Sequence, residues 1–178
     1  MKIVILAGST RMGATSTRAA SYAARLIEEQ GHEVTMVDLH THRLPLYCSD
    51  DEIQPDEVLS LRQAVLEANA VVLSTPEYHG SISGALKNAL DFLSSEQFDS
   101  KPVLSISSAG GAVGVNSLQH LQTIVRNVHG INCPEWISLG GVQREFDADG
   151  VPVTQGVQLR IHHAVHYFLE LAAKLLKE

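Results

Sequence analysis

The chain has few of the features that mark secreted, membrane-spanning or nucleic-acid-binding proteins. It contains only two cysteines, Cys48 and Cys133, which form neither a CxxC pair nor a disulfide framework. No apolar run approaches the roughly 18 residues of a membrane span, and the run at residues 2–7 is too short for a signal-peptide core. The formal net charge is -7, and no basic stripe with interleaved aromatic residues is present. We therefore expect a cytoplasmic protein with reduced thiols that binds neither nucleic acid nor membrane.

Aromatic residues are also scarce, at 5%, whereas hydrophobic residues make up 44% of the 178 positions. This hydrophobic content and chain length suffice for one domain with a sizeable core. No internal repeat, low-complexity tract or linker divides the sequence. A single domain over residues 1–178 is the prediction.

Strand-like apolar runs alternate with helical stripes along the whole chain. The expected strands are residues 2–7, 32–39, 70–75, 102–108 and 130–139, the last limited by Pro134 to an edge or interrupted strand. The expected helices are a stripe from Ala19 to Ile27 that Gly31 stops, and then about residues 56–68, 82–94, 116–129 and 155–177. Residues 40–55 are expected to form a long surface loop. Five strands separated by five helices predict an α/β fold, with a parallel sheet and helices on both faces.

A loop rich in glycine and hydroxyl groups, Gly8 to Thr17, joins the first strand to the first helix. Backbone N–H groups and the positive end of the helix dipole favour an anion at such a loop. Five hydroxyl side chains add donors: Ser9, Thr10, Thr15, Ser16 and Thr17. Arg11 adds a planar, charged fork suited to phosphate. The alternative is that these hydroxyls only cap the first helix.

Two common phosphate-binding motifs do not fit this loop. Gly8 and Gly13 have the spacing of a Walker A loop, but Ala14 stands where that motif requires lysine. The dinucleotide motif GxGxxG fails because Thr10 occupies the position of its second glycine. The residues therefore indicate a site for a single phosphate group.

The most informative segment runs from Ser74 to Asn88, between the third strand and the third helix. Ligands of open α/β sheets bind at polar, glycine-bearing loops of this kind. Its sequence, Pro76-Glu77-Tyr78-His79-Gly80-Ser81 and then Gly84-Ala85-Leu86-Lys87-Asn88 with Asp91, resembles the signature of the NADPH-dependent FMN reductase family. That family includes quinone reductases and azoreductases, and the run Ser81–Phe98 is similar to its azobenzene reductase branch. The loop after Gly8 is similar to the family's phosphate-binding segment, Gly-Ser-x-Arg followed by hydroxyl residues.

The resemblance implies a flavodoxin-like three-layer sandwich with a five-stranded parallel sheet in the order 2-1-3-4-5. It implies a bound FMN that takes electrons from NADPH, with NADH as an alternative donor, and passes them on in a ping-pong reaction. The implied acceptors are small molecules: quinones, azo compounds, free flavins or metal oxyanions. The implied assembly is a homodimer or a homotetramer.

By the same resemblance, three loops hold the flavin. Ser9, Arg11, Ser16 and Thr17 would bind its phosphate, and the choice among Thr15, Ser16 and Thr17 stays open. Pro76, Glu77, Tyr78 and His79 would contact one border of the ring, and Ser108, Ala109, Gly110 and Gly111 the other. No side chain is assigned a catalytic role, because the flavin N5 carries the hydride. Arg11 or Arg18 is expected near the phosphates of the nicotinamide nucleotide, and Glu77 has the alternative role of capping or pairing elsewhere.

Two other kinds of protein share the predicted topology. A flavodoxin, which only carries electrons, shields its flavin with aromatic side chains; these are scarce here, and Trp136 lies in the fifth strand rather than in a loop. A signalling receiver domain needs an aspartate at the end of the third strand, where Ser74 and Thr75 stand. The reductase is therefore the main prediction, and the electron carrier is the alternative.

Three histidines near the C-terminus, His162, His163 and His166, have the helical spacing of metal ligands. No Cys, Asp or Glu is tied to them by spacing as a further ligand. We expect them on the surface of an amphipathic helix, and we expect no metal site.

Overall fold

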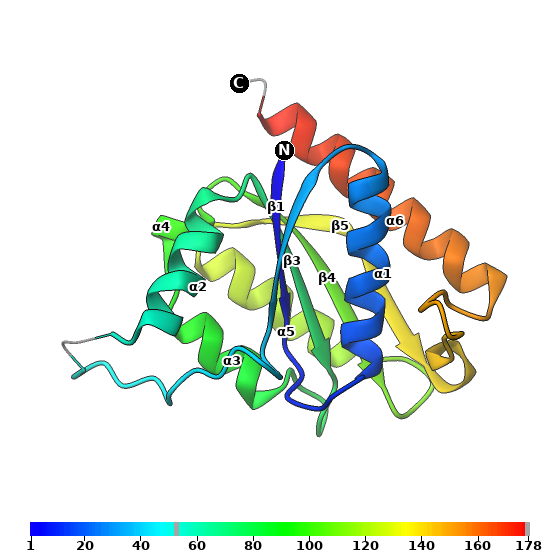
Figure 1. Ribbon diagram of the computed structural model, residues 1–178, viewed down its shortest axis with the longest axis horizontal. Coiled ribbons are helices and arrows are strands. Elements are labelled where there is room, and N and C mark those ends of the chain that lie inside the picture. Colours follow the sequence, from blue (N-terminus) through cyan, green and yellow to red (C-terminus); the bar gives the residue numbers. More distant parts are fainter. Residues whose placement is uncertain (52–53, 177–178) are drawn as a thin grey trace.

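The chain forms a sheet of five parallel strands with helices on both faces. The computed structural model describes residues 1–51 and 54–176. Its strands are β1 (Lys2–Ala7), β2 (Glu33–Asp38), β3 (Ala70–Pro76), β4 (Pro102–Ala109) and β5 (Ile131–Gly140). They lie in the order β2-β1-β3-β4-β5 (Figure 1), which confirms the predicted flavodoxin-like arrangement.

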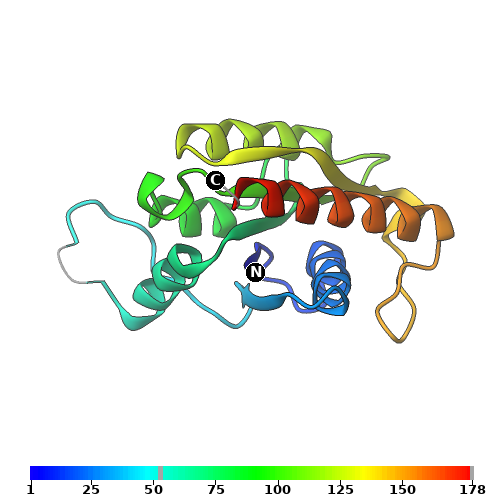
Figure 2. The ribbon, with the colours of Figure 1, turned by 90° about the horizontal axis from the view of Figure 1, so that it is seen from above.

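Two hydrophobic cores lie on opposite faces of the sheet. The helices are α1 (Thr15–Glu29), α2 (Asp56–Glu67), α3 (Gly84–Asp91), α4 (Ser95–Phe98), α5 (Val115–Asn127) and α6 (Gln155–Leu175). Side chains alternate along a strand, so Ile3 and Ile5 of β1 pack on one face with α1 and α6. Val4 and Leu6 pack on the other face with α2, α3, α4 and α5. Figures 1 and 2 show α1 beside α6, and α5 across the sheet from them.

The helix predicted over residues 82–94 is present as α3 (Gly84–Asp91), and a short further helix, α4 (Ser95–Phe98), follows it. α3 ends at Asp91, and Ser94 opens α4 with a capping box. Ser94 Oγ accepts a hydrogen bond from Glu96 N (3.3 Å), while Ser94 N donates to Gln97 Oε1 (2.9 Å). This cap holds Ser94 in an extended conformation, which separates α4 from α3. The prediction of a helix over residues 82–94 is therefore confirmed in α3, which is shorter than predicted by two residues at its start and three at its end, whereas α4 was not predicted.

The remaining predicted elements agree closely with the structure. The first helical stripe lies inside α1, and the other strands and helices end within two residues of the predicted bounds. β5 is an edge strand, as Pro134 predicts, and its register with β4 shifts between Val103 and Ser105. Lys177, the predicted end of the last helix, lies outside the described residues, as do residues 52 and 53 of the predicted loop. Among the residues described, no helix has both the length and the apolar character that a membrane crossing demands.

The loops that follow β1, β3, β4 and β5 all emerge at one edge of the sheet, the lower edge in Figure 1. The chain order changes direction between β1 and β3 at this edge. Open α/β sheets bind their ligands at such a switch point. We therefore expect a ligand site among the loops at this edge.

Gly140, the last residue of β5, lies where a side chain has no room. An added Cβ would overlap the Ala112 carbonyl, whereas one added at Gly84 would meet nothing within 4 Å. We predict that Gly140→Ala lowers the free energy of unfolding by about 1–3 kcal/mol, as overpacking does, and that Gly84→Ala does not. Urea denaturation of both variants checks this prediction. Equal stability of the two variants would contradict it.

Candidate functional site

Four segments meet at the carboxyl edge of the sheet. They are residues 8–14, 77–83 and 110–114, and the 3-10 helix η1 (Gly141–Arg144) after β5. Backbone hydrogen bonds tie neighbouring segments together: Gly8 N donates to Ser74 O (2.7 Å), Glu77 N to Ser108 O (2.8 Å) and Gly141 N to Gly111 O (2.8 Å). These bonds continue the strand pairing past the sheet and fix the segments relative to one another.

A cleft of about 450 Å³ lies between these segments. Its lining is Arg11, Ala14, Thr15, Pro76, Glu77, Tyr78, Ser108, Ala109, Gly110 and Arg144. Ligand pockets commonly have volumes of roughly 300–1,000 Å³, so a nucleotide-sized molecule fits. The structure thus brings together in one cleft residues from all three loops singled out in the sequence.

The first turn of α1, directly after the loop that follows β1, offers donors that have no partner among the described residues. α1 begins without a side-chain cap at Ala14, so the loop hydroxyls do not cap this helix. Within the described residues, Ser16 Oγ and Thr17 Oγ1 are buried and have no hydrogen-bond partner. Ser9 is buried too, and its Oγ accepts from Arg11 N (3.2 Å). Because a buried polar atom without a partner costs free energy, this arrangement fits a ligand with oxygen acceptors.

Contacts from β3 and α3 fix the position of that loop. Ser74 Oγ donates to Ser16 O (2.8 Å), and Ser83 Oγ donates to Gly8 O. A Cβ on Gly8 would lie 2.6 Å from Leu86 Cβ and 2.8 Å from Ser74 O. Only glycine allows the loop to lie this close to its neighbours.

The loop after β3 makes a tight reverse turn. Tyr78 N donates to Ser81 O and Ser81 N to Tyr78 O, both at 3.0 Å. His79 (φ 52°) and Gly80 (φ 73°) occupy the two central positions, and positive φ at both is typical of a type I′ turn. His79 therefore lies at the tip of the turn and not in the cleft, whereas residues 76–78 line it.

Glu77 joins the loop after β3 to the start of α5. Its Oε2 accepts a hydrogen bond from Ser117 N (2.9 Å), and Ser117 Oγ lies 2.6 Å from Ser107 Oγ. Gly114, the residue before α5, has no side chain to cap the helix. The Glu77 carboxylate supplies that cap, which agrees with the alternative role of capping considered for Glu77 in the sequence. Glu77 also lines the cleft.

Arg144 is a lining residue that the sequence motifs did not reveal. It follows β5, and the only signal in the sequence for its place in the cleft was that every loop after a parallel strand reaches this edge.

Gly111, by contrast, does not line the cleft, and its carbonyl instead accepts a hydrogen bond from Gly141 N. Thr17 and Arg18 lie on α1 and line a separate hollow beside Tyr22 and Arg25.

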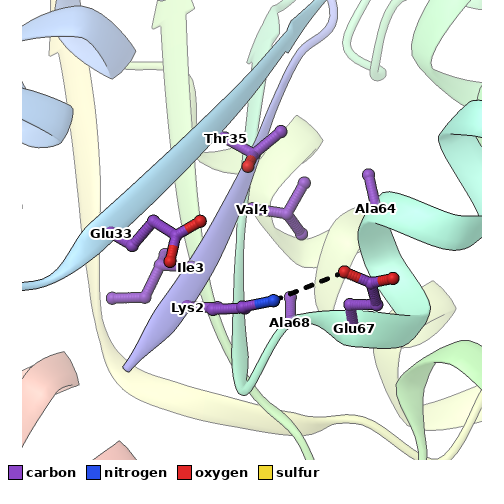
Figure 3. Close-up of a pocket in the computed structure, with 8 residues that line it drawn as sticks. All are labelled: Lys2, Ile3, Val4, Glu33, Thr35, Ala64, Glu67 and Ala68. Carbon is purple, nitrogen blue, oxygen red and sulfur yellow. Dashed lines mark hydrogen bonds and ion pairs between the residues drawn. The ribbon is translucent and has the colours of Figure 1, made fainter.

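A second hollow, of about 50 Å³, lies at the opposite edge of the sheet (Figure 3). It is formed by the starts of β1 and β2 and the end of α2, and Lys2 Nζ pairs there with Glu67 Oε2 at 3.5 Å. This volume is too small for a cofactor.

The three histidines of α6 each face a different protein group: His162 Nε2 lies 3.1 Å from Tyr22 Oη, His163 Nε2 3.5 Å from Glu135 Oε1, and His166 Nε2 3.6 Å from Glu170 Oε1. Across residues 1–51 and 54–176, no group of three or more His, Cys, Asp or Glu side chains is arranged to hold a metal.

Fold and cleft together define a flavodoxin-like protein with a loop rich in glycine and hydroxyl groups at the switch point of its sheet. The chain belongs to the NADPH-dependent FMN reductase family, whose model matches residues 1–143. Members of this family are oxidoreductases that use FMN and NADPH and act on small molecules.

Individual relatives agree with this assignment. The chain is 34% identical over 181 aligned positions to the NADPH azoreductase of Bacillus sp. (strain OY1-2), covering 98% of each chain. It is 37% identical over 143 positions to the FMN-dependent NADPH-azoreductase of Staphylococcus saprophyticus, covering 78% of this chain and 76% of that one. The flavoenzyme NAD(P)H:(acceptor) oxidoreductase FerB from Paracoccus denitrificans has a similar fold, with a TM-score of 0.82 at 23% identity and 97% of each chain covered.

The cap that Glu77 places on α5 can be tested by substitution. We predict that Glu77→Ala lowers the free energy of unfolding of the FMN-free protein by about 1 kcal/mol, because the helix loses its capping acceptor. Glu77→Gln keeps an acceptor oxygen and should retain most of the stability. Urea denaturation measures both. An alanine variant as stable as the wild type would show that the hydrogen bond to Ser117 N contributes nothing.

Proposed function

We propose that this chain binds FMN in the cleft and transfers electrons from NADPH, or from NADH, to quinones, azo compounds, free flavins or similar acceptors. The observation that supports this most directly is that, among the residues that the structure describes, the buried hydroxyls of Ser16 and Thr17 at the uncapped start of α1 have no hydrogen-bond partner. A phosphate there would accept hydrogen bonds from both hydroxyls and from the first N–H groups of the helix.

The proposed site residues fall into two groups. Ser9, Arg11, Thr15, Ser16 and Thr17 would hold the phosphate. Pro76, Glu77 and Tyr78 would border the ring on one side, and Ser108, Ala109 and Gly110 on the other; all six line the cleft. Ser9, Ser16 and Thr17 are not among the residues that line the cleft, and we keep them for the phosphate because the hydroxyls of Ser16 and Thr17 are buried with no partner in the described part of the chain. His79 and Gly111 do not line the cleft either, and we assign them to shaping the two loops.

Bound FMN supplies the hydride and electron chemistry. The chain's own part is to bind and orient the ring and to leave one of its faces accessible. Among the described residues of the lining, the only carboxylate is that of Glu77, and it already accepts from Ser117 N. We therefore assign no acid–base role to a side chain.

The lining also favours the reductase over the electron carrier. Tyr78 is the only aromatic residue among the described residues of the lining, and 51% of its surface is exposed. Trp136 lies in β5 and does not line the cleft. With so little aromatic cover, a bound ring would stay accessible to a donor and an acceptor in turn.

We further propose that residues 1–178 form one cytoplasmic domain that assembles as a homodimer or homotetramer and needs no nucleic acid or membrane partner. A hollow of about 470 Å³ between α3 and α5, with Ile82 and Ile124 in its lining, is mostly apolar and fits a second copy. Sedimentation velocity that finds only a monomer would contradict the proposed assembly.

Both cysteines are free thiols, and burial raises the pKa of Cys133 to about 11, which keeps it protonated and unreactive.

The phosphate loop can be tested by a double variant with a matched control. We predict that Arg11→Ala with Ser16→Ala weakens FMN binding by a few kcal/mol, since hydrogen bonds to a charged group contribute about 1.5–3 kcal/mol each. Arg18→Ala with Ser21→Ala changes the same residue types farther along α1 and should leave FMN affinity unchanged. Flavin fluorescence titration of the FMN-free proteins measures the difference. If both double variants bind FMN like the wild type, the loop assignment is wrong.

The use of one open cleft by donor and acceptor predicts ping-pong kinetics. Initial rates measured at several NADPH and quinone concentrations should give parallel double-reciprocal lines, because NADP⁺ leaves before the quinone enters. Intersecting lines would show that both substrates bind together. An absence of turnover with every small acceptor would favour the electron carrier.

A further inference from the structure

Arg144 lies in a different part of the cleft from the phosphate loop. It ends η1, directly after β5, whereas Arg11 follows β1. β3 and β4 lie between these two strands, so the strand ends are about three strand spacings, roughly 14 Å, apart. A single phosphate at the start of α1 would therefore lie near Arg11 and not near Arg144, which lines another part of the cleft.

The segment that carries Arg144 is anchored on both sides. Gly141 N donates to Gly111 O (2.8 Å), and Arg160 Nη2 donates to Gln143 Oε1 (3.1 Å). Arg144 Nε donates to Gly141 O (3.3 Å). Among the residues that the structure describes, neither terminal nitrogen of Arg144 makes a hydrogen bond, so the end of its fork is available to a ligand.

The charges around the cleft favour an anion at this position. In the described part of the chain, neither Arg144 nor Arg11 forms an ion pair with a carboxylate, although the protein has a net charge of -7. The carboxylate of Glu77 in the lining is held by Ser117 N. Two guanidinium groups, one at each end of the row of loops, thus line the cleft without a counter-ion from the described residues.

We propose that Arg144 binds a phosphate group of the nicotinamide nucleotide and so determines affinity for the electron donor; this inference rests on the proposed function. FMN carries one phosphate, which the loop after β1 accounts for. NADPH brings a pyrophosphate and a 2′-phosphate, and these need a cation beyond that loop. The planar fork of arginine matches a phosphate bidentately, and the anchored η1 places it beside the loop proposed to border the ring.

The test uses the FMN-loaded protein and redox-inert NADP⁺. Isothermal titration calorimetry should show that Arg144→Ala raises the Kd of NADP⁺ by about 10- to 100-fold, as loss of a charge-assisted bond predicts. Arg144→Lys should recover part of the affinity. Arg126→Ala, an exposed charge removal in the last turn of α5, should leave the Kd unchanged. FMN affinity of the FMN-free proteins should be the same for all variants.

Rapid-mixing kinetics then separate the donor from the acceptor. Arg144→Ala should raise the NADPH concentration needed for half-maximal reduction and leave the limiting rate and the reoxidation by a neutral quinone unchanged, because only binding of the donor is lost. Unchanged NADP⁺ affinity, weakened FMN affinity, or an effect confined to reoxidation by a sulfonated azo dye would each overturn the inference. A wild-type protein that binds no FMN would overturn the proposed function itself.

Discussion

Parallel pairing of the five strands is the constraint on which the rest of the structure depends. Because β1, β3, β4 and β5 run in the same direction, loops distant in sequence reach one edge of the sheet. The backbone bonds from Gly8 to Ser74, from Glu77 to Ser108 and from Gly141 to Gly111 extend this pairing beyond the strands. These bonds fix the position of the segments that line the cleft relative to one another.

Stability and binding compete at this edge. The start of α1 has no side-chain cap, and within residues 1–51 and 54–176 the buried hydroxyls of Ser16 and Thr17 have no hydrogen-bond partner, at a cost in free energy. Such costs are common at binding sites, where a ligand satisfies the groups that the fold does not. The start of α5 is handled in the opposite way, because Glu77 caps it from a neighbouring loop. The chain thus leaves one helix start available for an anion and closes the other with its own carboxylate.

Most of the fold could be predicted from the sequence because its signals are local. Apolar strand runs, the stop at Gly31 and the edge position implied by Pro134 each depend on a few adjacent residues. The short helix α4, which was not predicted, also had a local signal, the Ser94-x-x-Gln97 capping pattern. The bond from Glu77 to Ser117 and the placement of Arg144 in the cleft join residues far apart in the chain, so no spacing rule predicts them. Membership in a family identifies loops, but the geometry of the folded chain decides which side chains face the ligand.

The central claim is that this chain binds FMN and passes electrons through it. The most direct test is the visible absorption spectrum of the purified protein, followed by anaerobic addition of NADPH and then of a quinone. We expect a flavin band that bleaches with NADPH and returns with the quinone. A protein that carries no flavin and binds none when FMN is added would contradict the account.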